Sequence, residues 1–166
     1  LKDRVENGLV ATIDSLFTLP DFRINEKIFS LFIKIRSLAT KRFVIQTKNP
    51  DRPIFNYAIK GNVVDFYRDE IAERKAFAYP PFRLLIKVSR QGEEAEVRDQ
   101  MKLLVTQLAD YQPEIYPAFI SQIKNRFIMH ALIRRPLNQW PEPTLLAKLK
   151  SLTPTFTINV EPESIL

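Results

Sequence analysis

The sequence predicts an α+β protein with three parts: a partial α/β segment at residues 1–60, a connector at 61–82 and a complete α+β unit at 83–166. Three observations support this prediction. Short apolar runs of strand type alternate along the chain with segments of helical period. Two consecutive prolines, Pro80 and Pro81, prevent a continuous helix between the two larger parts. A chain of 166 residues can bury one good core plus a smaller appendage.

Residues 1–60 have the pattern of an α/β layer. The run GLVATI at 8–13 is a short apolar strand of the buried, parallel type. Residues 26–40 carry a helical stripe made of Ile28, Leu31, Phe32, Ile35 and Leu38. A second strand at 42–47 and a turn at 49–53 follow. Because a strand–helix–strand unit alone leaves its edges and one face uncovered, we expect this segment to dock onto the rest of the chain or onto another protein.

The connector at 61–82 is predicted to be a charged helix that ends in a rigid corner of Tyr79, Pro80 and Pro81. Its large apolar side chains fall on one side of the helix, at Val63, Phe66, Tyr67 and Ile71. Pro80 also biases the residue before it toward extended backbone. The sequence therefore predicts that the helix stops here and that a strand follows.

Residues 83–166 predict a β-α-β-β-α-β order. Strands are expected at 83–89, 115–121, 126–134 and 156–160, and a short helix begins at Pro143. The helix at 93–110 has one buried face, at Val97, Met101, Leu104, Leu108 and Tyr111. This order of elements is the split, ferredoxin-like arrangement.

The net charge of +6 is unevenly distributed. Residues 27–60 carry eight Lys or Arg against one acid, Asp51, and residues 115–141 carry four cations and no acid. Separate basic faces suggest a polyanionic partner, most plausibly nucleic acid, and the alternative is that these cations are merely solvated.

The cysteine and histidine counts bound the chemistry. The chain has no cysteine and one histidine, His130, so neither disulfides nor a metal site is expected, and no cofactor is predicted. His130 has no nucleophile patterned around it and is interpreted as structural. The absence of cysteine fits a cytoplasmic location, and no apolar run is long enough to span a membrane.

Several short strings, in order, resemble one family. FYRDEIAERKAFAYPPF at 66–82 is similar to the segment that joins the helicase core to the C-terminal domain in the replication-restart helicase PriA family. GLVATID, LPDFR and VIQTKNP before it, and YPAFI, KNRF and NVEP after it, follow the same family's order. The resemblance implies that residues 1–60 are a remnant of the second RecA-like helicase lobe. It also implies that residues 83–166 are a PriA-like C-terminal domain that contacts forked or single-stranded DNA.

The resemblance also locates two helicase motifs. Gly8, Asp14, Asp21 and Arg23 match the motif V region, although a structural role is favoured, with Asp21 as a turn or cap acceptor and Arg23 in a surface ion pair. At motif VI, Leu38 stands where the family has its first arginine, and Lys41 replaces the last. Lysine cannot supply the bidentate fork of an arginine.

ATP hydrolysis by this chain alone is therefore not expected. Its three glycines lie too far apart to build a phosphate-binding loop. One alternative is that the chain is a fragment of an ATP-dependent 3′–5′ DNA helicase that needs missing lobes.

Two groups of residues are predicted to contact DNA. The first is the basic set Lys34, Arg36, Lys41 and Arg42. The second lies at the turn between two strands, where Lys124 and Arg126 can reach phosphates and Phe119, or less favourably Phe127, can stack on a base. The alternative places both phenylalanines in the core.

A protein-docking site is predicted around Arg134, Arg135 and Trp140. In the resembled family this neighbourhood helps to hold the acidic, apolar tail of the single-stranded-DNA-binding protein, and arginine beside an apolar pocket suits such a carboxylate-bearing tail. Other primosome proteins are possible partners. Alternatively Trp140 anchors a loop, and the whole unit is an RNA- or protein-binding ferredoxin-like module.

Overall fold

The computed structural model describes residues 4–123 and 126–166, and the chain divides into two compact units, Leu1–Glu73 and Arg74–Leu166. The division falls inside the segment 61–82 that the sequence predicts to be a connector. Both units combine helices with strands, so the predicted mixed α and β class is confirmed. Each unit is described separately below.

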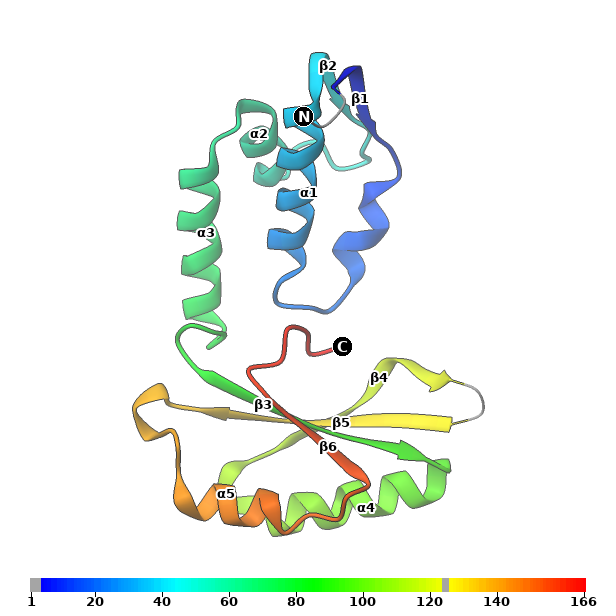
Figure 1. The fold of residues 1–166 in the computed structure, drawn as a ribbon, viewed down its shortest axis with the longest axis vertical. Helices are drawn as coiled ribbons and strands as arrows, with labels where there is room; N and C mark the ends of the chain where they lie inside the picture. Colours follow the sequence, from blue (N-terminus) through cyan, green and yellow to red (C-terminus); the bar gives the residue numbers. More distant parts are fainter. Residues whose placement is uncertain (1–3, 124–125) are drawn as a thin grey trace. The chain divides into compact units, whose positions relative to one another are not determined.

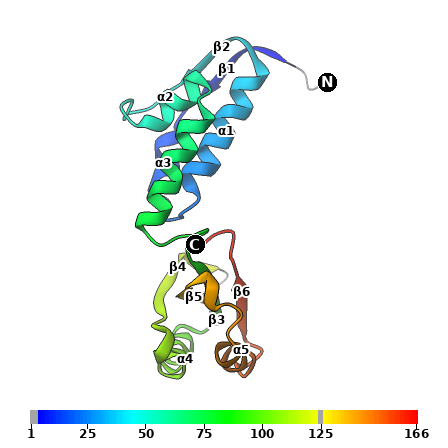
Figure 2. The same ribbon diagram turned by 90° about the vertical axis from the view of Figure 1, so that its left-hand side faces the viewer.

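The first unit pairs two parallel strands with three helices (Figures 1 and 2). Its elements are β1 (Val5–Val10), a 3₁₀ helix (Ile13–Thr18), α1 (Ile24–Leu38), β2 (Ala39–Ile45), α2 (Pro53–Lys60) and α3 (Val63–Ala76). The β1 and β2 strands run parallel, with Gly8 opposite Phe43 and Val10 opposite Ile45.

Several elements of the first unit differ from the prediction, and the predicted helix at 26–40 and strand at 42–47 lie at Ile24–Leu38 and Ala39–Ile45. The strand predicted at 8–13 ends at Val10, because Thr12 adopts left-handed backbone (φ 56°) and the chain enters the 3₁₀ helix. Helix α2 was not predicted at all. Pro53 starts it from the first helical turn, and Gly61, at φ 68°, ends it.

The core of the first unit lies between α1 and its neighbours. Phe32 and Ile28 of the predicted stripe are buried, whereas Leu31 is 38% exposed and Phe29 takes its place inside. The Phe29 ring stacks on Phe66 of α3, with centroids 3.8 Å apart. Gly8 lets β1 approach the end of α1, because a Cβ there would lie 3.1 Å from Ile35 Cγ2.

The apolar side predicted for α3 is only partly buried. Phe66 is buried, but Tyr67 and Ile71 are 41% and 42% exposed, and Glu70 is the other buried position. The helix therefore packs through Phe66 and Glu70, which lie one turn apart on the same face. The apolar side chains of Tyr67 and Ile71 lie outside this face.

The second unit is a four-stranded antiparallel sheet with two helices. Its elements are β3 (Leu84–Gly92), α4 (Glu94–Gln107), β4 (Glu114–Ile123), β5 (Arg126–Arg135), α5 (Pro143–Lys150) and β6 (Phe156–Val160). The strand order is β4-β5-β3-β6. Glu93 caps α4, since its side chain accepts from the Glu96 backbone N–H at 3.1 Å.

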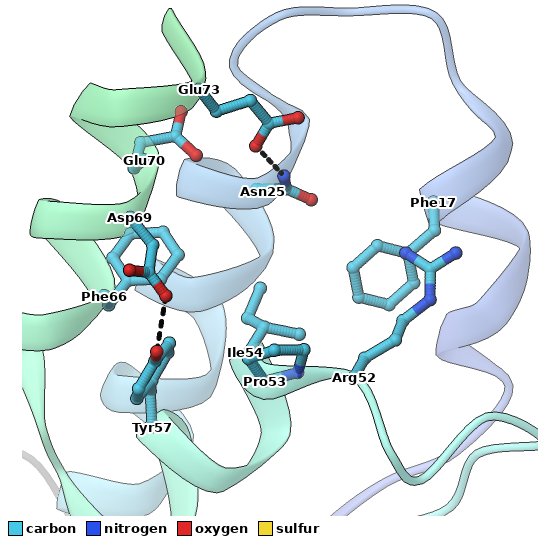
Figure 3. Close-up of a pocket in the computed structure, with 10 residues that line it drawn as sticks. All are labelled: Phe17, Asn25, Arg52, Pro53, Ile54, Tyr57, Phe66, Asp69, Glu70 and Glu73. Atoms are coloured by element: carbon cyan, nitrogen blue, oxygen red, sulfur yellow. Dashed lines mark hydrogen bonds between the residues drawn. The ribbon is translucent and has the colours of Figure 1, made fainter.

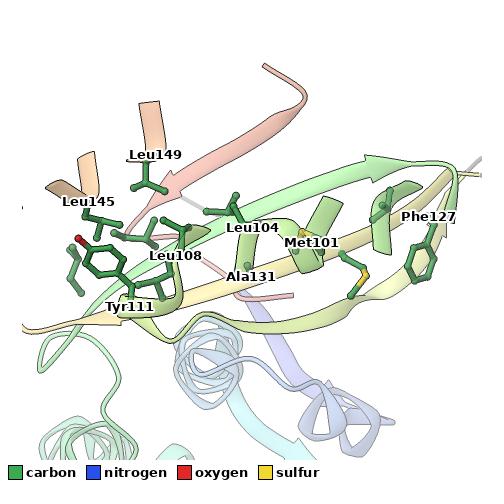
Figure 4. Packing of buried hydrophobic residues seen from close by; sticks show 14 residues of the cluster. Met101, Leu104, Leu108, Tyr111, Phe127, Ala131, Leu145 and Leu149 are labelled. Carbon is green, nitrogen blue, oxygen red and sulfur yellow. The ribbon is translucent and has the colours of Figure 1, made fainter. Parts of the chain in front are cut away.

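Helices α4 and α5 cover one face of this sheet (Figures 1 and 2). The buried face predicted for the helix at 93–110 is confirmed, although α4 itself ends at Gln107: Leu108 is its C-cap and Tyr111 lies in the 3₁₀ helix Ala109–Tyr111. All five predicted residues are buried: Val97, Met101, Leu104, Leu108 and Tyr111. They pack with Leu145 and Leu149 of α5 on β3 and β5 (Figure 4). Burial of these side chains is the main driving force for the unit.

Candidate nucleic-acid interface

Three of the predicted basic residues surround one cavity in the first unit. Arg36, Lys41 and Arg42 line a cavity of about 320 Å³ together with Ala39, Phe43 and Ile59, which we name the basic cavity. Helix α1 runs into β2 without an intervening loop, so the cations of its last turn and of the following strand lie close together. Lys34, one turn earlier, is exposed and is not among the residues that line the cavity.

The three cations are held differently. Arg36 Nε donates to the Ile59 carbonyl at 3.1 Å, which fixes the guanidinium at the end of α2. Lys41 Nζ lies 2.6 Å from Glu6 Oε1 in an exposed ion pair, which contributes little stability. Within the described residues Arg42 has no ion-pair partner and is exposed. The lining carries positive charge only, as an anion site requires.

The hairpin of β4 and β5 carries the second predicted DNA-contact group. Phe119 and Ile120 are 57% and 63% exposed, and Arg126 is exposed. The pairing of the two strands is irregular between Pro117 and Gln122. Phe127 is buried in the core, so it cannot stack on a base, and Lys124 lies outside the described residues.

The motif V candidates have structural contacts. Gly8 permits the close packing described above. Asp14 accepts hydrogen bonds from Thr47 Oγ1 at 2.6 Å and from the Lys48 backbone N–H at 3.0 Å, and these bonds, that from Thr47 first, lower the pKa of Asp14. The pair ties the start of the 3₁₀ helix to the chain that leaves β2.

Asp21 and Arg23 stand at the start of α1. Asp21 is buried, its Oδ1 accepts from the Arg23 backbone N–H at 3.0 Å, and its Oδ2 lies 3.0 Å from Lys27 Nζ. This is the acceptor role favoured from the sequence. The Arg23 guanidinium carbon lies 5.5 Å from the centre of the Phe22 ring, a cation–π contact in place of the expected ion pair.

Arg134 and Arg135 point to opposite faces of the sheet, because successive strand residues alternate. Arg134 pairs with Glu114 of β4. Arg135 faces the helices, where it lies 2.7 Å from Glu142 and 2.9 Å from Gln139 Oε1. Trp140 packs against the core nearby. The two arginines therefore do not face one common site, and only Arg135 lies on the same side of the sheet as Trp140.

A second cavity in the first unit was missed by sequence reasoning. It has a volume of about 180 Å³ and lies among α2, α3 and the 3₁₀ helix, with Phe17, Ile54 and Phe66 as apolar walls (Figure 3). Asp69, Glu70 and Glu73 also line it against a single cation, Arg52, so the net charge of its lining disfavours a phosphate. Because α2 was not predicted, no pattern in the sequence brought these residues together.

Residues 4–123 and 126–166 hold no group of three or more potential ligands that could bind a metal ion. Among the helices in those ranges, none combines the length and the apolar character that crossing a membrane demands.

Comparison with known proteins identifies similar sequences. No protein-family model matches the chain. It is 26% identical to the replication restart protein PriA of Thermotoga maritima over 168 aligned positions, which cover 96% of this chain. Identity is 33% to the PriA of Chlamydia muridarum and 30% to that of Treponema pallidum, each over 76% of this chain. The chain spans 23%, 18% and 21% of these three relatives, respectively. Over nearly all of its residues this chain is therefore a PriA-like region, similar to the C-terminal part of the replication restart proteins and spanning less than a quarter of their length.

Proposed function

We propose that this chain is a non-catalytic DNA-binding and protein-docking module that acts in replication restart or primosome assembly, at forked or single-stranded DNA. The observation that carries the proposal is the convergence of Arg36, Lys41 and Arg42 on the basic cavity. The name of the similar proteins supports the replication-restart setting.

In this proposal the basic cavity holds the sugar–phosphate backbone. A guanidinium can bind a phosphate through two parallel hydrogen bonds, and Arg42 has this capacity because it is exposed. The hairpin adds Phe119 for an unpaired base and Arg126 for a neighbouring phosphate. Backbone contacts of this kind bind DNA without reading its sequence.

The architecture that we propose follows the same family. The β1-α1-β2 segment is a remnant of a RecA-like helicase lobe, which the parallel pairing of β1 with β2 supports. Residues 83–166 form a ferredoxin-like domain, which the order β4-β5-β3-β6 supports.

Protein docking is assigned to the neighbourhood of Arg135 and Trp140. The Arg135 guanidinium is already paired with Glu142, and the Tyr111 hydroxyl donates to the same carboxylate at 3.0 Å. A partner that presents a carboxylate therefore has to displace Glu142 from Arg135. An acidic, apolar tail satisfies this requirement if its apolar end packs against Trp140.

Fluorescence anisotropy with labelled forked, single-stranded and duplex DNA tests the proposal. Arg42→Glu is the informative variant, because Arg36 and Lys41 also bond to the chain itself. It should weaken binding about tenfold or more, the loss expected for one charge-assisted contact. The matched control is Lys102→Glu, which changes the net charge equally at a side chain that is 73% exposed on α4.

Three results would count against this function. Equal loss in Arg42→Glu and Lys102→Glu would mean that net charge alone drives binding. No binding of any DNA at low salt would overturn the DNA-binding function. Tighter binding of a matched single-stranded RNA would favour the alternative of an RNA-binding module.

A further inference from the structure

The sheet of the second unit has one face that α4 and α5 do not cover. Residues 161–166, which we name the strap, cross this outer face (Figure 1). The Glu161 backbone N–H donates to the Leu85 carbonyl at 2.8 Å, and the backbone of Glu161 is left-handed at φ 52°. Pro162 is buried, so the chain turns back onto the sheet immediately after β6.

Side chains from two strands hold the strap through its backbone carbonyls. Lys87 Nζ of β3 donates to the carbonyls of Ser164 at 2.8 Å and Leu166 at 3.0 Å. The Tyr116 hydroxyl of β4 donates to the Ile165 carbonyl at 2.7 Å. Since β5 lies between β3 and β4, the strap spans all three strands.

This face carries a cation and two rings, which are groups that single-strand binding surfaces use, beside the buried apolar side chains of Leu85 and Leu132. Lys87 supplies a cation, and the Tyr116 and His130 rings lie edge to face with centroids 5.7 Å apart. Antiparallel sheets that bind single strands stack bases on such rings and hold phosphates with adjacent cations. His130 is only 6% exposed and shares a 2.8 Å hydrogen bond with Ser89 Oγ.

We propose that the outer face is a second contact surface for single-stranded nucleic acid and that the strap is its intramolecular competitor. The inference rests on the proposed DNA-binding function and adds regulation to it. The strap occupies the Nζ of Lys87, which a phosphate oxygen would otherwise accept from, and its exposed Glu161 and Glu163 repel a polyanion. The apparent affinity is then the intrinsic affinity multiplied by the fraction of molecules whose strap is open.

The test compares the intact chain with a variant that ends at Glu163. This deletion removes the three carbonyls that Lys87 and Tyr116 bind but keeps Glu161 and Pro162 in place. Anisotropy with labelled oligothymidine should show about tenfold tighter binding by the truncated chain, as expected if one molecule in ten is open when intact. Adding Lys87→Met to the truncated chain should abolish the gain.

His130 is the one histidine of the sequence and lies beside Tyr116, which anchors the strap, so its ring protons can be followed as a probe of this face. Burial, with a smaller effect of Lys87, lowers its pKa to about 4 in the intact chain. NMR titration of its ring protons should show this pKa rising toward 6.5 in the truncated chain. An unchanged affinity for oligothymidine in a chain whose His130 pKa has risen would overturn the proposal.

Tyr116→Phe serves as a milder variant if the truncated chain does not fold. It keeps the ring for stacking but removes one anchor of the strap, so affinity should rise about two- to threefold. No rise in that variant would overturn the proposal as well.

The two hypotheses fail separately. Insensitivity to Arg42→Glu with a gain on truncation would overturn the basic cavity alone, and the reverse result would overturn the strap alone. If no variant binds any DNA, both are wrong.

Discussion

At the scale of single residues, Phe119 is the exposed ring that we propose for nucleic-acid stacking. The other ring considered with it, Phe127, is inside the core, so the two similar side chains have different surroundings. Phe119 lies on β4, whose pairing with β5 is irregular between Pro117 and Gln122, so strand periodicity could not place its side chain. The sequence favoured Phe119 over Phe127 for stacking and left open that both rings lie in the core.

Phe119→Ala should weaken binding of single-stranded DNA by about five- to tenfold and leave duplex binding nearly unchanged. Stacking of a base on an aromatic ring contributes about 1–3 kcal/mol, and paired bases do not offer their faces to it. Anisotropy titrations with both DNAs measure the difference. Ile120→Ala, at an adjacent and equally exposed side chain, is the control and should leave both affinities unchanged.

His130 gives the chain a dependence of stability on pH. Its pKa is lowered to about 4 when folded, mainly by burial, whereas an unfolded histidine titrates near 6.5. Between these values the unfolded chain binds more protons, so the free energy of unfolding falls as pH decreases from about 6.5 toward 4. Above pH 6.5 the residue has no such effect.

Urea unfolding of the intact chain and of His130→Gln at pH 7 and pH 4.5 measures this contribution. The intact chain should lose more free energy of unfolding than the variant over this interval, because glutamine does not titrate. Equal losses in the two proteins would mean that His130 is not buried as a neutral ring.

At the scale of elements, α3 shows how little of a helix's apolar surface a small unit can use. The stack of Phe66 on Phe29 is a buried contact that joins it to α1, whereas Ile71 is 42% exposed. Phe66→Ala should lower the free energy of unfolding by about 3–5 kcal/mol. Ile71→Ala on the same helix should cost less than about 1 kcal/mol. Chemical denaturation of both variants measures this, and similar losses would support the face predicted from the sequence instead.

How much of each element could be predicted depended on how regular its pattern is. The buried stripe that runs from α4 into the 3₁₀ helix after it keeps a regular spacing from Val97 to Tyr111 and was predicted residue by residue. Helix α2 has only eight residues and directly follows a turn, so no period stands out. Strand β1 begins with Val5, Glu6 and Asn7, which do not form the apolar run of a buried strand. These residues are extended because they pair with β2, and the local sequence does not show that pairing.

The candidate site was predictable to a similar degree. The charge pattern identified the cations, but it could not show that Arg36, Lys41 and Arg42 meet at one cavity, since that depends on where α2 ends. Nor could it show that Arg134 and Arg135 are already paired with Glu114 and Glu142.

At the scale of the whole molecule, we propose that the chain does not hydrolyse ATP. The resemblance places Leu38 where the family has an arginine, and the sequence contains no phosphate-binding loop motif. We expect no ATP hydrolysis above the rate of a protein-free blank, with or without DNA, in a coupled phosphate-release assay. Hydrolysis that depends on single-stranded DNA would contradict this and favour the helicase alternative.

The most direct test of DNA binding is the salt dependence of the dissociation constant for single-stranded DNA. If the basic cavity holds phosphates, the logarithm of affinity should fall linearly with the logarithm of salt concentration. Arg42→Glu should then make the slope shallower by about 0.7 for each contact removed. Lys102→Glu should leave the slope unchanged. An identical slope in the intact chain and in Arg42→Glu would contradict the assignment of the basic cavity, and no binding at low salt would contradict DNA binding altogether.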